Sequence, residues 1–439
     1  MSENLTFRNS RPSWANACVG DNGSPSYIDY AKGFSEAANL LINEVISCKS
    51  RKHSVDTLIY PICFNMRHAV ELWLKGTVVV LQELAKFKNV NLDFNLSSSH
   101  DIGNIWNFIK VNAVDFDIRY SSFINKLDEY IEDISNIDST GQTFRYPFDG
   151  ESKKHLTEVS IINVCILKVR FAELEAILDE LNYFNLYVEE EYSLGSYTRK
   201  LSRSELYNLA NDLPDRSQWS NSEFLVIKQR TMSKYELSSN DFSKAINIIE
   251  DNYEMGRLIS SVPSLKGICS NGLNDFFDEW VKVHDIERLT KPIDIEDRMI
   301  EFTKPDFESM ENDGKVEAEC CDTLLKKLCV EAVSGLKALF YFGEHKDFTE
   351  YYISMYERTK TEFSVTSEKD PDRYRQSLNH ILNKTNAFEN ILMSLYFLGY
   401  GELSDQILKR YNVKGCFDWL EKAKNRSLFS KPDFCGYNL

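Results

Sequence analysis

The sequence contains 439 residues, 43% of them hydrophobic, with 27 Phe and 22 Tyr. A chain of this length can bury two or three domain cores, and its composition argues against long disordered segments. Glycine and proline are sparse, at 18 and 10 residues, which argues against a sandwich or barrel built on frequent tight turns. We therefore predict an all-α fold.

The charge of the chain limits its partners. The formal net charge is −16, and residues 1–185 contain 18 Lys and Arg against 24 Asp and Glu. Neither half offers a basic platform, so stable binding to duplex DNA is not expected, although an acidic protein can still hold a local basic pocket. No apolar run approaches the roughly 18 to 20 residues of a membrane span, and the N-terminus has no apolar signal region. We expect a cytoplasmic protein with no membrane partner.

The ten cysteines are scattered, with no Cys-x-x-Cys pair and no nearby histidine pairing. The cluster of Cys320, Cys321 and Cys329 matches no tetrahedral spacing. Glycine-rich phosphate loops and a His-Glu-x-x-His motif are absent from the sequence as well. We expect reduced thiols, no metal and no cofactor.

In chain order, residues 1–25 are rich in Asn, Ser, Gly and Pro and are predicted to form an extended arm. From Ser26 onward the apolar side chains recur at three and four residues, which predicts helices. The predicted helices cover residues 26–45, 55–84, 102–109, 120–134 and 156–181. These five helices are expected to form one domain over residues 26–185, with a boundary between 185 and 200.

A small helical domain is predicted over residues 200–300. Ser-x-x-Glu patterns begin at Ser202 and Ser220, and Ser238 precedes a further apolar pattern. Serine at such positions caps a helix, so three short capped helices are expected.

The last domain is predicted over residues 301–439. Residues 335–352 and 390–407 share an apolar helix, a glycine (Gly343 or Gly399) and a second helix. Glycine at a helix end can take the left-handed cap, after which the second helix folds back. We predict helical-hairpin, repeat-like packing for this domain.

Three segments of the first domain combine charged and apolar side chains in one pattern. They are NMRHAVELWLK at 65–75, HDIGNIW at 100–106 and FRYPFD at 144–149. On a helix, Arg67, Glu71 and Lys75 lie four residues apart and form a charged ladder beside an apolar face. Together the segments resemble the HEPN-like proteins, and the resemblance covers residues 25–185.

HEPN-like domains are small all-helical units of prokaryotic nucleotide and RNA biology, prominent in defence and toxin systems. The resemblance implies an RNA- or nucleotide-directed effector, one form of which is a metal-independent endoribonuclease of a phage-defence or toxin–antitoxin system. Active members use an arginine and a histidine a few residues apart on a helix, usually paired across a dimer. An imidazole can then move a proton from a ribose 2′-hydroxyl while a guanidinium holds the phosphate.

Polar side chains of the three segments are the candidate site residues. The candidate catalytic residues are Arg67, His68, His100 and Arg145. The candidate ligand-binding residues are Glu71, Lys75, Asp101 and Tyr146. They could converge on one pocket for a phosphate or a turn of RNA backbone. In the other interpretation, the ladder is an exposed set of salt bridges and Asp101 caps a helix.

The spacing inside this domain departs from that of the active family members. Arg67 directly precedes His68, and nine residues separate Arg145 from His155. The family spacing occurs instead in DRYRQSLNHIL, between Arg375 and His380. That pair is an alternative catalytic pair, or it lies on a solvated helix face.

Two functions stay open from the sequence. The first is the RNA- or nucleotide-directed effector, acting as a homodimer or with a partner protein. The second is a non-catalytic helical adaptor that binds a protein partner or a phosphorylated ligand. The acidic charge and the missing Arg–His spacing favour the adaptor, whereas the clustered polar signature favours the effector.

Overall fold

The computed structural model describes residues 4–20, 22–49, 51–148, 152–157, 159–284, 286, 304–413 and 415–437, with backbone only for 304–313. Over these residues the protein is 69% helical and has no strand, which confirms the predicted all-α class. One isolated antiparallel bridge joins Phe148 and Lys154. The chain divides into two compact units, Met1–Gly195 and Ser196–Leu439.

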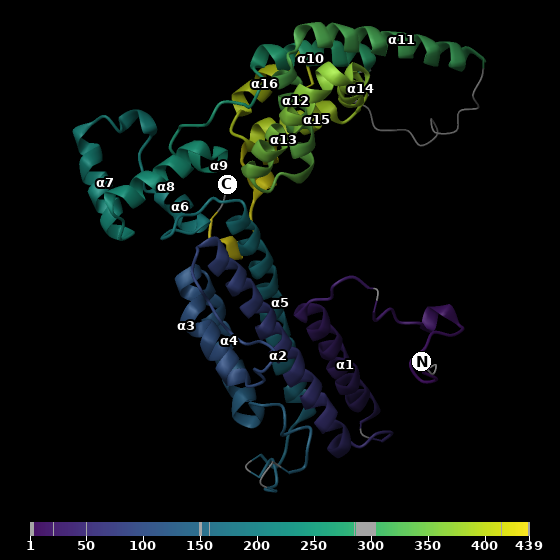
Figure 1. Ribbon diagram of the computed structural model, residues 1–439, viewed down its shortest axis with the longest axis vertical. Helices are drawn as coiled ribbons and strands as arrows, with labels where there is room; N and C mark the ends of the chain where they lie inside the picture. Colours follow the sequence, from purple (N-terminus) through teal and green to yellow (C-terminus); the bar gives the residue numbers. More distant parts are fainter. Residues whose placement is uncertain are drawn as a thin grey trace. The chain divides into compact units, whose positions relative to one another are not determined.

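The first unit is a bundle of five long helices preceded by an exposed arm with one turn of 3-10 helix, Ser13–Ala15. The helices are α1 (Tyr27–Cys48), α2 (Val55–Phe87), α3 (Ile102–Phe116), α4 (Tyr120–Asp138) and α5 (Val164–Ser193). Helix α2 is central, because it packs against α1, α3 and α5, while α4 packs against α3 and α5 (Figure 1). Residues on α2 can therefore reach the ends of several other helices.

Side-chain caps fix where these helices begin. Ser26 and Asp29 form a reciprocal capping box at α1, and Asp101 accepts a hydrogen bond of 2.9 Å from the Asn104 amide at α3. Asp101 thus acts as a helix cap, which is the alternative to its predicted ligand-binding role. Asn163 caps α5 by accepting from the amides of Cys165 and Ile166.

The predicted bounds of α5 are wrong at both ends. The helix was expected over 156–181, but Asn163 delays its start to Val164 and buried apolar side chains continue to Tyr192. The predicted boundary segment of 185–200 is therefore helical as far as Ser193.

The second unit is built from described helices of 5 to 24 residues. They are α6 (Arg203–Asn211), α7 (Ser222–Lys234), α8 (Ser239–Asp251), α9 (Tyr253–Leu258), α10 (Ser270–Val283), α11 (Lys304–Lys327), α12 (Val330–His345), α13 (Thr349–Lys369), α14 (Pro371–Leu382), α15 (Ala387–Phe397), α16 (Gly401–Arg410) and α17 (Leu420–Lys424). Single 3-10 turns lie at Arg216–Gln218, Ser427–Phe429 and Asp433–Cys435. One hydrophobic core draws side chains from Tyr253 to Phe429. The boundary predicted at residue 300 lies outside the described residues.

Two of the three predicted serine caps are present. Ser202 and Ser238 form capping boxes with Glu205 and Asp241 at α6 and α8. The cap predicted at Ser220 is wrong, because α7 begins one residue later, with Asn221 at its N-cap and no side-chain hydrogen bond there.

The two glycines of the predicted hairpins play different parts. Gly399 ends α15 with a φ of +88°, as predicted. Gly343 instead lies inside α12, and the left-handed residue after that helix is Lys346. A Cβ at Gly343 would lie 2.2 Å from the carbonyl oxygen of Asn390, so this glycine allows α12 and α15 to approach closely. Helix α12 also packs on α13, and α15 on α16, while the repeat-like arrangement stays a prediction.

Candidate functional site

Helix α2 carries a buried ionic cluster centred on Glu71. The Glu71 carboxylate accepts hydrogen bonds from Arg67, from Lys75 Nζ at 2.8 Å and from His100 Nδ1 at 3.0 Å. Arg67, Glu71 and Lys75 are 3%, 2% and 4% exposed. The ladder is therefore buried, so the alternative interpretation as an exposed set of salt bridges is wrong in its exposure. Four of the predicted site residues do come together here.

Arg67 uses its remaining donors on backbone oxygens. Its Nε donates to the carbonyl of Asp138 at 3.1 Å, and Nη2 donates to Ser139 at 2.6 Å and to the carbonyl of His100. Asp138 and Ser139 end α4, where carbonyl groups lack partners within the helix. Arg67 thus ties α2 to the end of α4 and the segment before α3, and its donors are occupied by the protein itself.

The electrostatics of Glu71 match this structural role. Burial raises the pKa of its carboxyl group, but the nearby His68, the hydrogen bonds from Lys75 and His100 and the charge of Arg67 lower it more. The net effect holds the pKa of Glu71 well below its ordinary value of 4.5. The cluster therefore contains a charged carboxylate at neutral pH.

The two histidines of the signature lie at the edge of this cluster. His68 packs edge-on against Phe34 and stacks on Phe64, with ring centroids 4.4 and 5.8 Å away, and its Nδ1 lies 3.7 Å from Glu71. His100 has a side chain that is 61% exposed. Among the candidate catalytic groups on this cluster, the imidazole of His100 is thus the most accessible to solvent.

Arg145 lies outside the cluster, on the segment that joins α4 to α5. Its guanidinium sits over the rings of Phe64 and Tyr146, 5.7 and 5.6 Å from their centroids. The side chain is exposed, and it makes no ion pair within the described ranges of the chain. Phe64 also stacks on His68, so one aromatic ring separates Arg145 from the Glu71 cluster.

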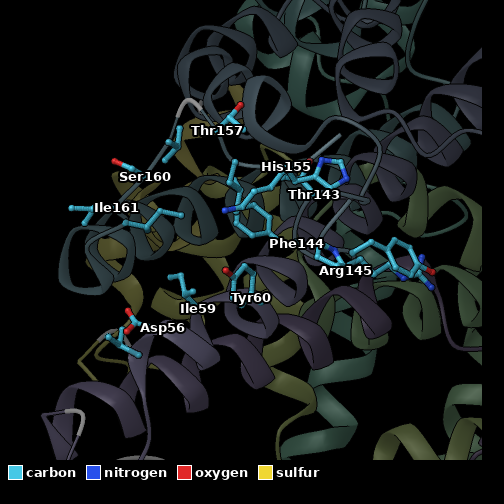
Figure 2. A pocket seen from close by; sticks show the side chains of 17 residues that line it. Asp56, Ile59, Tyr60, Thr143, Phe144, Arg145, His155, Thr157, Ser160 and Ile161 are labelled. Carbon is cyan, nitrogen blue, oxygen red and sulfur yellow. The ribbon is translucent and has the colours of Figure 1, made fainter. Parts of the chain in front are cut away.

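Arg145 lines a pocket of about 800 Å³ between the start of α2 and the α4–α5 segment (Figure 2). The lining residues are Val55, Asp56, Ile59, Tyr60, Thr143, Phe144, Arg145, Tyr146, Pro147, Lys154, His155, Leu156, Thr157, Val159, Ser160, Ile161 and Ile162. Three of them carry nitrogen groups that bind anions, and Asp56 is the acidic residue among them. In the view of Figure 2, Arg145 and His155 lie on the same side of the pocket, across from Asp56 and Ile161.

A tight fold of the segment brings these nitrogen groups together. The bridge between Phe148 and Lys154 and a hydrogen bond of 3.2 Å from the His155 amide to the Pro147 carbonyl reverse the chain. Lys154 makes no ion pair with any described residue, and His155 Nε2 is shielded from solvent without a hydrogen-bond partner there. The pocket is thus lined by two cationic side chains without an ion pair among the described residues and by an imidazole whose Nε2 has no hydrogen-bond partner there.

Lys154 and His155 were missed as site residues. Nine residues separate Arg145 from His155, which departs from the spacing of the active family members, so the sequence does not pair them. The turn-rich composition around Pro147 was the available signal, since a chain reversal brings distant residues together.

The alternative pair lies on α14, where Arg375 is engaged by α11. Arg375 bonds to Asp322 on α11 through Nε at 3.0 Å and to the carbonyl of Ala318 at 3.2 Å. His380 is largely exposed. The small part of it that is buried, together with the charges of Lys384 and Lys337, lowers its pKa.

Comparisons with protein-family models, curated proteins and solved structures find no match to this chain. No described helix is both long enough and apolar enough to cross a membrane. Within the same residues, no cluster of three or more His, Cys, Asp or Glu side chains is arranged to hold a metal ion.

Proposed function

We propose that the first unit binds a phosphate group of an RNA or nucleotide in the Arg145 pocket, and that the protein is a HEPN-like RNA- or nucleotide-directed effector. One observation carries this proposal. Arg145, Lys154 and His155 line the same pocket, and neither cation is neutralised by an ion pair among the described residues. A local anion site of this kind is compatible with an acidic chain.

The side chains suit a phosphate. A guanidinium can donate two parallel hydrogen bonds to phosphate oxygens, and a lysine ammonium adds a mobile point charge. Arg67 has the same chemistry, but its donors already bond to Glu71 and to three carbonyl groups. The phosphate is therefore assigned to Arg145 rather than to Arg67.

Metal-independent cleavage of RNA is the reaction that these groups would support. His155 would take the proton of a ribose 2′-hydroxyl, whose oxygen then attacks the adjacent phosphorus. The 5′-oxygen leaves and takes up a proton from water, and the protonated His155 returns its proton to water, while Arg145 stabilises the charge on the phosphate oxygens. A second protomer that contributes another Arg145 pocket fits the paired sites that the family resemblance implies.

The alternative is a non-catalytic helical adaptor for a protein partner or a phosphorylated ligand. The saturation of the Glu71 cluster favours it, because most of the sequence signature then serves the fold. In this case the Arg145 pocket would hold a phosphate without cleaving it.

Incubation of the purified protein with total RNA and with tRNA, with and without a chelator, tests the proposal. Arg145→Ala and His155→Ala should each reduce cleavage roughly a hundredfold or more and leave the fold intact. Arg375→Ala and His380→Ala are matched controls and should cleave like the wild type.

The outcomes distinguish the Arg145 pocket from other catalytic sites and the effector from the adaptor. Loss of cleavage only in Arg375→Ala and His380→Ala would move the site to α14. Loss in His68→Ala with full activity in His155→Ala would move the base to the Glu71 cluster. Phosphate binding that depends on Arg145, with no cleavage under any metal condition, would establish the adaptor.

A further inference from the structure

A second cavity, of about 470 Å³, adjoins the Arg145 pocket. It lies among α2, α4 and α5, and both cavities share Phe144, Val159, Ile161 and Ile162. Most of its wall is aliphatic or aromatic, formed by Cys63, Met66, Ile134, Ile137, Phe144, Val159, Ile161, Ile162, Ile166, Leu167, Phe171 and Leu174. An apolar chamber therefore lies next to the proposed phosphate pocket.

The polar residues of this cavity are largely engaged elsewhere. Arg67 belongs to the Glu71 cluster, and Arg170 bonds to Glu129 at 2.7 Å while stacking 4.0 Å from the centre of the Tyr130 ring. The Tyr130 hydroxyl donates to Glu173 at 2.9 Å. A nucleobase would lose water from its polar edge and find few partners here, which disfavours it. A hydrocarbon chain meets no such penalty.

The rim of the cavity leaves apolar side chains in water. Ile161 is 87% exposed and Ile166 is 66% exposed, although both line the cavity. A bound chain would cover both side chains, and removing that apolar surface from water favours its binding.

We propose that the apolar cavity binds the aliphatic chain of an alkyl phosphate ester whose phosphate is held by Arg145 and Lys154. The inference rests on the proposed phosphate pocket and extends it to a second class of ligand. Because RNA and the ester need the same cations, the ester displaces RNA from the pocket. The first unit thereby becomes sensitive to a small amphipathic anion.

Calorimetric titration with monomeric decyl phosphate and with inorganic phosphate tests this inference. The wild type should bind decyl phosphate at least tenfold more tightly than inorganic phosphate. Ile134→Trp, which fills the cavity from α4, should lose that gain and keep its affinity for inorganic phosphate. Val169→Trp is the matched control, since Val169 is 58% exposed on the same unit and lines neither cavity.

Each result has one meaning. Equal affinity of the wild type for the two probes, or an equal loss in Ile134→Trp and Val169→Trp, would overturn the apolar site and leave the phosphate pocket standing. Unchanged binding of both probes in Arg145→Ala would overturn the phosphate pocket. Binding to phosphatidic acid vesicles with no binding of the monomer would also refute the inference, because the occupant would then be a membrane surface.

Discussion

The Glu71 cluster and the Arg145 pocket contain the same kinds of side chain in opposite states. In the cluster, arginine, lysine and histidine surround one carboxylate, and the hydrogen bonds of Arg67 all go to the protein. In the pocket, Arg145 and Lys154 have no described carboxylate partner. Residue type therefore does not distinguish a structural cluster from a ligand site. The distinction lies in whether the donor groups already form hydrogen bonds or ion pairs within the protein.

The largest expected effect is the loss of the central carboxylate. Glu71→Ala leaves the buried charges of Arg67 and Lys75 without a counter-charge, which should reduce the free energy of unfolding by about 3–5 kcal/mol. Chemical denaturation measures this loss. Glu83→Ala, on the same helix but in an exposed pair with Lys86, should cost about 1 kcal/mol or less. Similar losses of unfolding free energy in Glu71→Ala and Glu83→Ala would contradict a structural role for the cluster.

Acid should weaken the cluster in a defined direction. The pKa of Glu71 is lowered in the folded protein from an ordinary value of 4.5. Its contribution to stability is therefore fully present above that value and is lost as the pH falls further, toward the folded pKa. Unfolding curves between neutral pH and about pH 3 should show a steeper loss for the wild type than for Glu71→Gln. Parallel curves for the wild type and Glu71→Gln would contradict the stabilising role of the charged Glu71 carboxylate.

Loss of Arg145 should affect binding and not the fold. Arg145→Ala should weaken phosphate or RNA binding by about tenfold to a hundredfold, the range of a hydrogen bond to a charged group. The free energy of unfolding should change by less than about 0.5 kcal/mol, because the side chain is exposed. Filter binding and denaturation measure the two quantities. Unchanged affinity here, together with lost affinity in a folded Arg67→Lys variant, would reverse the comparison between the two regions.

Gly141 gives a smaller test of how tightly the cluster is enclosed. Its φ is +78°, and a Cβ there would lie 3.1 Å from Arg67 Nη1. Gly141→Ala should therefore cost about 1–2 kcal/mol through backbone strain and displacement of the guanidinium. Gly33→Ala, in helix α1 with nothing within 4 Å, should be neutral or stabilising by up to about 1 kcal/mol. Thermal unfolding of both variants measures the two effects. Equal shifts in melting temperature would show that Arg67 is not confined by Gly141.

The sequence predicted local features better than contacts. The spacing of apolar side chains predicts helices in the first unit, and Ser202 and Ser238 form the caps expected of them. Gly343 could not be interpreted in this way, because its role depends on the backbone of Asn390, which is remote in sequence. The late start of α5 was readable from Asn163, a residue type that favours caps.

The candidate site shows the same limit. The alternative interpretation of the i, i+4 ladder on α2 as ion pairs agrees with the structure. The burial of the ladder could not be predicted, because it depends on where α4 ends, since Asp138 and Ser139 supply acceptors for Arg67. His155 could not be paired with Arg145 from spacing, because a chain reversal and not a helix joins them. Local periodicity contains no information on either arrangement.

The smallest effect is expected at Arg375, whose guanidinium bonds to Asp322 and to the carbonyl of Ala318. Its pair with Asp322, at 2.9 Å, joins side chains that are 40% and 55% exposed. An exposed pair of this kind contributes about 0.2–1 kcal/mol, so Arg375→Ala should change stability by no more than that. RNA or phosphate binding should match the wild type, measured beside Arg145→Ala in the same assay. A loss of binding as large as that of Arg145→Ala would mean that the second unit also contacts the ligand. An arginine whose donors are bonded within the protein would then also bind ligand, which would contradict the distinction between the Glu71 cluster and the Arg145 pocket.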